Sequence, residues 1–314
     1  MELGNQPYAV VVGGVNIDIC GRPNRPPVPR DSNPGRVYTS LGGVGRNIAH
    51  NMSLLGLPTA LVTALGDDGN ARLVEESCQA LGLDLSHSLA VPGGATSTYL
   101  FITDHRGEME LAVSDMDIYR HLTPEYMEGQ LPFLNAARLV VMDTNLPAET
   151  VEFLARRCTA PLFADPVSTV KAEKLRPVLG KIHTLKPNRL EAALLTGVDI
   201  VDEASLHRAA EKLLEAGVGR VFLSLGSRGV FCADEREHLY LPVYKGAIQN
   251  TTGAGDAFMA ALAWGYWNGC SLASCGRAGL AAATLAAEST DTINPSLSHG
   301  AILELIHQNK EELI

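Results

Sequence analysis

The stretch Asn250-Thr-Thr-Gly-Ala-Gly-Asp-Ala-Phe258 places two glycines and a carboxylate at the start of an apolar run that contains no proline. The residues from Asp256 onward are strong helix formers, so the sequence predicts a helix that ends near Gly269. The two glycines then lie at a helix N-terminus, where backbone N–H groups lack intrahelical partners and the helix dipole adds positive charge. Because glycine allows a ligand close to the backbone, this corner can hold an anion such as a phosphate.

Asp256 has two interpretations at this corner. A carboxylate beside a phosphate site opposes phosphate binding by charge repulsion, so binding alone does not explain its presence. One interpretation is a general base that accepts the proton of an attacking hydroxyl. The other is a capping residue at a glycine turn with no chemical role. The stretch by itself leaves both open.

Length and charge limit the classes of protein that fit the chain. The 314 residues are 46% hydrophobic and 19% charged, which fits one large α/β domain over residues 1–314 with an inserted segment. The formal net charge of −10 opposes binding to nucleic acid, and no basic stripe offsets it. We therefore expect a polyphosphate to be held locally, by helix ends and a divalent metal.

The cysteines and the N-terminus indicate the cytoplasm. The six cysteines are scattered without C-x-x-C spacing, which favours free thiols in a reducing compartment over disulfides or a zinc site. No basic region precedes an apolar core at the N-terminus, so we expect no signal peptide. No run approaches the ~18 apolar residues that cross a membrane, so a membrane is not an expected partner.

Apolar strands followed by polar residues alternate with helical stretches along the chain. Residues 8–12 predict a buried strand, and the residues after it include Asn16 and Asp18, which either grip substrate hydroxyls or cap a turn. From Leu139 onward, strand and helix alternate regularly, which indicates a parallel sheet with right-handed crossovers. The polar residues at the strand ends are then expected to meet in one crevice.

A second glycine cluster, Gly42-Gly-Val-Gly-Arg-Asn-Ile-Ala49, also opens a predicted helix. Asn47 lies in its first turn, where it can face a ligand held at the glycines. Neither cluster completes G-x-G-x-x-G, because Ile48 and Phe258 occupy the last position. A nicotinamide-dependent oxidoreductase is therefore disfavoured.

Three β-rich runs, at 36–41, 97–103 and 108–113, predict a small sheet outside the main one, whereas residues 22–34 lack a regular pattern. We expect this sheet to form a lid from segments at about 22–41 and 96–117. An edge hairpin without function is the alternative. The lid sheet is also a candidate surface for a homodimer.

Two further motifs suit a nucleotide. In Lys186-Pro-Asn-Arg-Leu-Glu191 the glutamate lies in the first turn of a helix, where it either faces a hydrated metal or completes a capping box. The run that ends in Ser224-Leu-Gly-Ser-Arg-Gly229 predicts a buried strand that turns at glycines, over which a nucleotide can lie.

In order along the chain, the two glycine clusters and the N-x-x-E motif at 188–191 resemble the signature motifs of the PfkB (ribokinase-like) sugar kinase family. The resemblance runs from Val10 to about Ala287. It implies a doubly wound, mostly parallel sheet with a small β-sheet lid, and an ATP- and Mg²⁺-dependent phosphotransferase with an alcohol acceptor. The stretches 31–35, 42–49, 114–116, 165–168 and 183–192 further resemble members that phosphorylate the 5′-hydroxyl of pseudouridine.

The resemblance implies roles only for residues that match the family's motifs. Asp256 is the implied general base, and the implied anion hole consists of Gly253, Ala254 and Gly255. The residues implied to hold ribose hydroxyls are Asn16, Asp18, Gly43 and Asn47. The residues implied to bind ATP are Asn188, Ser224, Gly226 and Gly229, and Glu191 is implied to organise Mg²⁺ through water.

One departure concerns K⁺. The second motif commonly begins with Asp in this family, where it helps to form a potassium site, whereas Asn250 stands here. The lost charge counts against activation by a monovalent cation. Two other functions stay open: a family kinase for another sugar or nucleoside, such as ribose or a purine nucleoside, and a non-catalytic nucleoside sensor.

Overall fold

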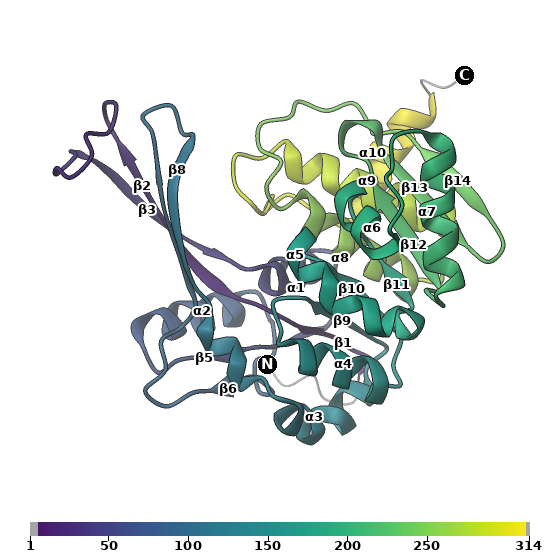
Figure 1. Ribbon diagram of the computed structural model, residues 1–314, viewed down its shortest axis with the longest axis horizontal. Helices are drawn as coiled ribbons and strands as arrows, with labels where there is room; N and C mark the ends of the chain where they lie inside the picture. The colour runs from purple at the N-terminus through teal and green to yellow at the C-terminus, as the bar shows by residue number, and fades with distance from the viewer. Residues whose placement is uncertain (1–5, 312–314) are drawn as a thin grey trace.

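The computed structural model describes residues 6–311, and its larger sheet holds eight strands (Figure 1). Their spatial order is β14 (His238–Leu241), β13 (Val230–Asp234), β12 (Arg220–Ser224), β11 (Thr184–Leu185), β10 (Leu162–Asp165), β9 (Leu139–Asp143), β1 (Ala9–Val12) and β4 (Thr59–Val62). The pairs from β4 to β12 are parallel, and β13 and β14 join antiparallel at one edge. The predicted mostly parallel sheet is confirmed.

Helices cover both faces of this sheet, so its central strands are buried on both sides. In β1, Val10 and Val12 join one apolar cluster, whereas Ala9 and Val11 join the other. The first cluster lies under α3 (Pro124–Ala136), α4 (Ala148–Arg157), α5 (Thr169–Ala172), η2 (Glu173–Lys181), α6 (Arg189–Thr196) and α7 (Glu203–Glu215). The second lies under α1 (Val44–Leu54), α2 (Gly69–Ala80), α8 (Ala254–Trp267), α9 (Leu272–Ala287) and α10 (His299–Glu311).

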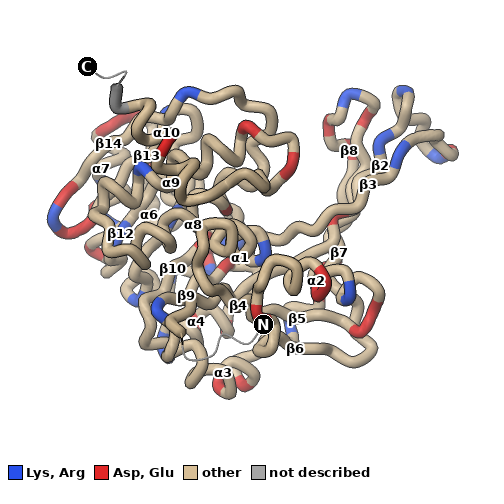
Figure 2. The backbone as a smooth tube through the Cα atoms, turned by 180° about the vertical axis from the view of Figure 1, so that it is seen from behind, with Lys and Arg blue, Asp and Glu red and all other residues tan. Residues whose placement is uncertain are grey.

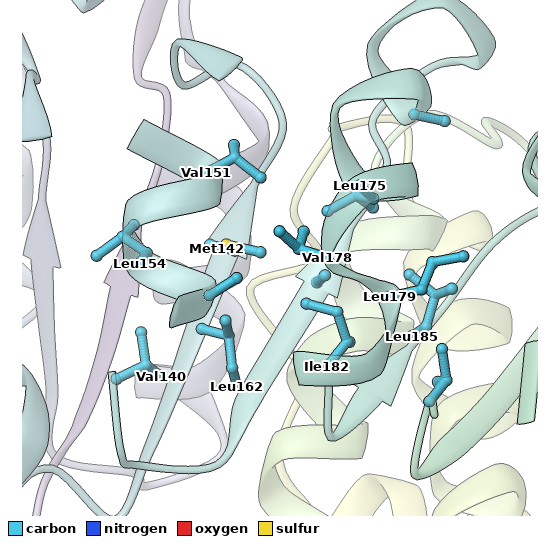
Figure 3. Close-up of a cluster of buried hydrophobic side chains, with 14 of the residues drawn as sticks. Val140, Met142, Val151, Leu154, Leu162, Leu175, Val178, Leu179, Ile182 and Leu185 are labelled. Atoms are coloured by element: carbon cyan, nitrogen blue, oxygen red, sulfur yellow. The ribbon is translucent and has the colours of Figure 1, made fainter. Parts of the chain in front are cut away.

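Figure 3 shows part of the first cluster, where side chains of α4 and η2 meet those of the strands below. Val151 and Leu154 come from α4, Leu175 and Val178 come from η2, and Met142 rises from β9. Each such side chain contributes roughly 1.5–3 kcal/mol by leaving water. This packing holds the carboxyl ends of the strands in fixed positions.

The smaller sheet extends away from the larger one (Figure 1). Its order is β3 (Gly35–Gly42), β2 (Asn16–Pro23), β7 (Thr98–Thr103) and β8 (Met109–Asp115), with only β2 and β7 parallel. The three predicted runs are strands of this sheet, but the sequence analysis missed β2. Asn16 and Asp18 begin β2 rather than ending the first strand, because the chain turns after β1 at two glycines and continues into the smaller sheet.

Four short elements complete the fold. Strand β5 (Ala64–Leu65) pairs with β6 (Leu89–Ala90), and η1 (Asp117–His121) and η3 (Gly226–Arg228) are short 3₁₀ helices. The six cysteines are free thiols. Within residues 6–311, no helix has the length and apolar character that a membrane crossing requires. Basic and acidic residues are interspersed along the chain, including the outer end of the smaller sheet (Figure 2).

Candidate active site

The glycines of the predicted anion corner lie at the N-terminus of α8. Gly253 is the N-cap, with φ of 81°, and a Cβ there would lie 2.1 Å from the carbonyl oxygen of Thr292. Only glycine fits this position, because both the backbone angle and the neighbouring carbonyl exclude a side chain. Among the described residues, the amides of Gly255 and Asp256 have no backbone acceptor. These N–H groups can therefore donate to an anion at the end of the helix.

Asp256 lies in the first turn of α8 and is not its cap, so the capping interpretation is wrong. Asn47 Nδ2 donates a hydrogen bond of 2.9 Å to Asp256 Oδ2. Burial raises the pKa of Asp256 to about 7, aided by the carboxylates of Asp165 and Asp143 and opposed by Asn47 and Lys186. A carboxylate with this pKa can both accept and release a proton near neutral pH.

A buried ion pair lies beside this corner. Lys186 Nζ is 3.2 Å from Asp165 Oδ2, and a Cβ on Gly255 would lie 3.4 Å from the same nitrogen. Burial lowers the pKa of Lys186, but the carboxylates of Asp165, Glu191 and Asp256 outweigh it, so the pKa is raised and the ammonium stays charged. The corner thus has a cation in addition to its free amides.

The sequence analysis assigned no role to Lys186, Asp165 or Asp143. Their only signal was a position at the carboxyl ends of β11, β10 and β9. Asp143 is fully buried and accepts hydrogen bonds of 2.8 Å from the amides of Gly14 and Asn145. It therefore connects the glycine turn after β1 to the end of β9, close to the anion corner.

The four residues expected to hold ribose hydroxyls lie at the start of β2 and around the N-terminus of α1. Asn16 Nδ2 donates to Asp18 Oδ1, and Gly43, with φ of 94°, is the N-cap of α1. Asn47 is buried, and its Oδ1 has no hydrogen-bond partner among the described residues. An acceptor buried without a partner costs about 1–3 kcal/mol, so a ligand hydroxyl would relieve it. Asn47 thus joins the hydroxyl-binding group to Asp256.

The pKa of Asp18 is raised to about 6 by burial, whereas the hydrogen bond from Asn16 and the charge of Arg46 lower it. The carboxylate is therefore mostly ionised at neutral pH. An ionised carboxylate accepts hydrogen bonds from two hydroxyls at once, which suits the neighbouring hydroxyls of a ribose.

A cavity of about 350 Å³ begins at the anion corner and fits a nucleotide. Its polar end holds Lys186, Ala254 and Gly255, and its walls include Ser224, Gly226 and Gly229. Part of the remaining wall is an apolar surface that suits a flat base, formed by Val243, Ile248, Leu280, Ala283 and Ala287. Asn188 lines a neighbouring hollow together with Ser224 and Gly226, and backbone pairing joins Asn188 to Ser224.

Asn188 and Glu191 form a capping box at the start of α6, which is one of the two interpretations of Glu191; the other is a hydrated metal. The Asn188 side chain accepts from the Glu191 amide at 3.0 Å, and Glu191 Oε2 accepts from the Asn188 amide at 2.8 Å. Within residues 6–311, no group of three or more His, Cys, Asp or Glu residues could hold a metal ion. Mg²⁺ can bind through one or two carboxylates, with water and phosphate as its other ligands, and the neighbouring buried carboxylates of Glu191 and Asp165 fit that pattern. A metal role for Glu191 stays a prediction.

Asn250 takes part in the loop before α8. Its Oδ1 accepts from the Thr252 amide at 3.0 Å, and its Nδ2 donates to the Thr290 carbonyl at 3.2 Å. The side chain thus stabilises the loop as a neutral amide. The expected weakness of K⁺ activation stays a prediction.

Comparison with known proteins agrees with this geometry. Residues 6–299 match the family model described as pfkB family carbohydrate kinase. The chain is 36% identical over 301 residues to the pseudouridine kinase of Escherichia coli (strain K12). The matched residues cover 95% of this chain and 96% of that protein. Among solved structures, a putative sugar kinase from Clostridium perfringens matches with a TM-score of 0.88 and 30% identity, covering 97% of this chain and 96% of that one.

A ribokinase from Arabidopsis thaliana, solved with ribose and ATP, matches with a TM-score of 0.84 at 24% identity, covering 96% of this chain and 98% of that one. At this identity the likeness concerns the fold, which is the ribokinase-like arrangement of a larger and a smaller sheet. The chain therefore belongs to the pfkB family of carbohydrate kinases and is a phosphotransferase with an alcohol group as acceptor.

Proposed function

We propose that the protein transfers the γ-phosphoryl group of ATP to the 5′-hydroxyl of pseudouridine. The observation that carries the proposal is the position of Asp256. Its carboxylate accepts a hydrogen bond from Asn47, one of the expected ribose-binding residues, and it follows Gly255, which lines the nucleotide cavity. The relative from Escherichia coli, at 36% identity, supports pseudouridine as the substrate.

Asp256 acts as the general base. It accepts the proton of the 5′-hydroxyl as the new O–P bond forms and the bond from the γ-phosphorus to the leaving oxygen breaks. Asn47 holds the carboxylate in place from the substrate side. Because the pKa of Asp256 is about 7, the base is ionised above neutral pH, and kcat is expected to fall below it.

Backbone amides stabilise the transferred group. Gly253 sets the backbone direction at the start of α8, and the free amides of Gly255 and Asp256 donate to the phosphoryl oxygens, whereas the Ala254 amide donates to the Thr251 carbonyl at 3.3 Å. Such donors are aimed before the reaction, so they stabilise the transition state without reorganisation. Lys186 adds a fixed positive charge at the same place.

ATP is expected to lie in the 350 Å³ cavity, with its base against the apolar wall and its phosphates toward α8. Ser224, Gly226 and Gly229 border the nucleotide, and Asn188 lies at the adjoining hollow. A bound Mg²⁺ would neutralise charge on the phosphates. The residues that would hold it through water are Glu191 and Asp165.

The smaller sheet is proposed to act as a lid over the nucleoside. Asp18 lies on one face of it, and Tyr99, its neighbour on β7, shares that face. The ribose is held at the root of this face by Asn16, Asp18, Gly43 and Asn47. Closing the sheet would exclude water from the transferring group.

The opposite face of the smaller sheet is proposed to pair two copies of the chain. Strand pairing shows which residues share this face. They are Gly21, Val37, Leu100, Ile102, Leu111 and Val113. Val37 is 73% exposed and Leu111 is 64% exposed. An exposed apolar sheet face of this kind marks a protein interface.

A coupled ATPase assay tests the function. Pseudouridine, uridine, inosine, ribose and fructose 6-phosphate would be compared at equal concentration, each with and without K⁺. We expect pseudouridine to have the highest kcat/KM, with little effect of K⁺. A higher value for ribose or inosine would assign another substrate within the family, and nucleoside binding without ATP consumption would indicate a sensor.

A further inference from the structure

Arg46, in the first turn of α1, is a buried cation without a salt bridge. Its side chain is 6% exposed, and among residues 6–311 no carboxylate lies close enough to its guanidinium to count as an ion pair. Its Nε also lacks a hydrogen-bond partner among those residues. Buried charges are normally paired, so an unpaired buried arginine next to a ligand site calls for a reason.

The contacts of Arg46 join α1 to β3, to α2 and to the turn between β1 and β2, at the root of the smaller sheet. Its Nη1 donates to the Leu41 carbonyl of β3 at 3.3 Å, and its Nη2 donates to Ser77 Oγ of α2 at 3.1 Å. Its backbone amide donates to the Gly14 carbonyl, in the turn between β1 and β2, at 3.0 Å. Arg46 therefore fixes the end of β3 against the body of the protein.

The carboxylate of Asp18 lies next to this anchored strand end. Ile17 pairs with Leu41, and a Cβ on Gly42 would lie 2.2 Å from Asp18 Oδ2. The Asp18 carboxylate thus rests over Gly42, the neighbour of the residue that Arg46 bonds. Gly42 leaves the space that the carboxylate needs, and Arg46 supplies the nearby positive charge.

Few other charged or titratable groups face Arg46. His50 lies one turn further along α1, and burial together with the charge of Arg46 lowers its pKa to about 4, so it is neutral at physiological pH. Cys78 of α2 is buried, and its pKa is raised to about 11 by that burial, so it stays a thiol. Asp18 is therefore the group of opposite charge on which Arg46 acts.

We propose that Arg46 is a positioning residue that holds Asp18 as an ionised, oriented carboxylate for the hydroxyls of the substrate ribose. This inference rests on the proposed function, because it takes Asp18 as the ribose-binding group. Arg46 does not touch the nucleoside itself. It acts on Asp18 in two ways: its hydrogen bond to Leu41 fixes the end of β3 beside the Asp18 carboxylate, and its positive charge favours the ionised form of that carboxylate.

The sign of the effect follows from the groups around Asp18. Burial raises the pKa of Asp18, and Asn16 and Arg46 lower it. Removing the charge of Arg46 raises the pKa further, so a larger share of Asp18 is protonated between pH 5 and 7. A protonated Asp18 accepts fewer hydrogen bonds from the ribose, and nucleoside binding weakens as pH falls.

The test measures the Kd of pseudouridine by calorimetry between pH 5 and 8 without ATP, in an Asp256→Asn background that removes the second titrating carboxylate. Arg46→Met removes the charge and the hydrogen bonds, Arg46→Lys keeps the charge, and Ser77→Ala removes only the bond to α2. Asp18→Asn serves as the reference in which the titration is lost. Thermal unfolding of each variant reports whether it is folded.

We expect binding by the background protein to weaken with a midpoint near pH 6, the pKa of Asp18. In Arg46→Met the midpoint should move up by about one pH unit, which weakens binding about 5-fold at pH 6. Arg46→Lys and Ser77→Ala should keep the midpoint within about 0.3 pH units of the background. Asp18→Asn should bind weakly at every pH with no midpoint.

Two results would overturn the inference: an unchanged midpoint in Arg46→Met, or an equal loss of binding at all pH values, which would mark a purely structural role. If Arg46→Met does not fold, Arg46→Gln replaces it, because glutamine can still donate to Leu41 without a charge. A parent protein that neither binds nor phosphorylates nucleosides would refute the proposed function instead. The two failures are therefore distinguishable.

Discussion

At the scale of single residues, the proposed general base Asp256 is electrostatically costly to keep ionised. It lies near two other carboxylates, Asp165 and Asp143, and its pKa of about 7 reflects its burial and their charges. The hydrogen bond from Asn47 and the charge of Lys186 only partly offset this cost. A carboxylate whose pKa is shifted this far by burial and like charges is typical of a catalytic site.

Replacing Asp256 by asparagine should lower kcat by about 10²-fold or more, because a positioned general base contributes ~10²–10⁴-fold. Asparagine keeps the shape of the side chain and its contact with Asn47, so the KM for the nucleoside should change little. Steady-state kinetics with a coupled assay measures both constants. A kcat within a few-fold of the parent would remove Asp256 from the mechanism.

The same substitution should stabilise the protein at high pH. The folded pKa of Asp256 is about 7 and its ordinary value is 3.8, so the folded state binds more protons between these pH values. Its contribution to stability is therefore full below about pH 4 and is lost as pH rises through 7. We expect Asp256→Asn to raise Tm by a few degrees at pH 8 and to leave it nearly unchanged at pH 4, as measured by calorimetry.

At the scale of secondary structure elements, α8 is bounded by two glycines with different surroundings. Gly253 precedes its first residue with φ of 81° and is closely packed against Thr292. Gly269 follows the helix with φ of 71°, and a Cβ there would meet no atom within 4 Å. Both need a left-handed backbone, but only Gly253 lies at the anion corner.

These two glycines allow a matched comparison. Gly269→Ala should cost about 1 kcal/mol of unfolding free energy from backbone strain alone and leave kcat nearly unchanged. Gly253→Ala adds a clash with the Thr292 carbonyl, so it should cost more stability and lower kcat at least 10-fold by moving the amides of the anion corner. Denaturant unfolding and steady-state kinetics measure the two effects. Equal kcat values in both variants would argue against an anion hole at α8.

At the scale of the whole molecule, the larger and the smaller sheet differ in how their faces are covered. The larger sheet is covered on both faces and fixes the strand ends that carry Asp143, Asp165 and Lys186. The smaller sheet has one face with Asp18 and an opposite face with exposed apolar side chains. The second face is the proposed dimer surface.

A charge on that surface should break the dimer. Leu111→Glu places a carboxylate on the apolar face, on its edge strand β8, whereas Leu73→Glu, at an exposed position of α2 on the body of the protein, is the control. We expect the parent and the control to sediment as dimers and Leu111→Glu as a monomer, because an unpaired charge in an apolar interface is costly. A parent that sediments as a monomer at micromolar concentration would refute the dimer.

The sequence by itself determined the parallel strands, the glycine corners and the helices that begin at them, because these depend on residues close together in the chain. It also indicated Asp256, Asn47 and Asn188 as members of one family's motifs, and Ser224 at the end of a strand that turns at glycines. Local patterns could not reveal the strand β2, because its residues read equally well as the end of a first strand. Pairing with β3 and β7 decided where it lies.

Only the tertiary structure decided which charges share the site. The bond between Asn47 and Asp256 joins residues 209 positions apart, and the pair of Lys186 with Asp165 depends on two adjacent strand ends. The isolation of Arg46 likewise follows from how α1 packs between β3 and α2. Burial and Coulomb interactions depend on distance in space, and spacing along the chain does not contain that distance.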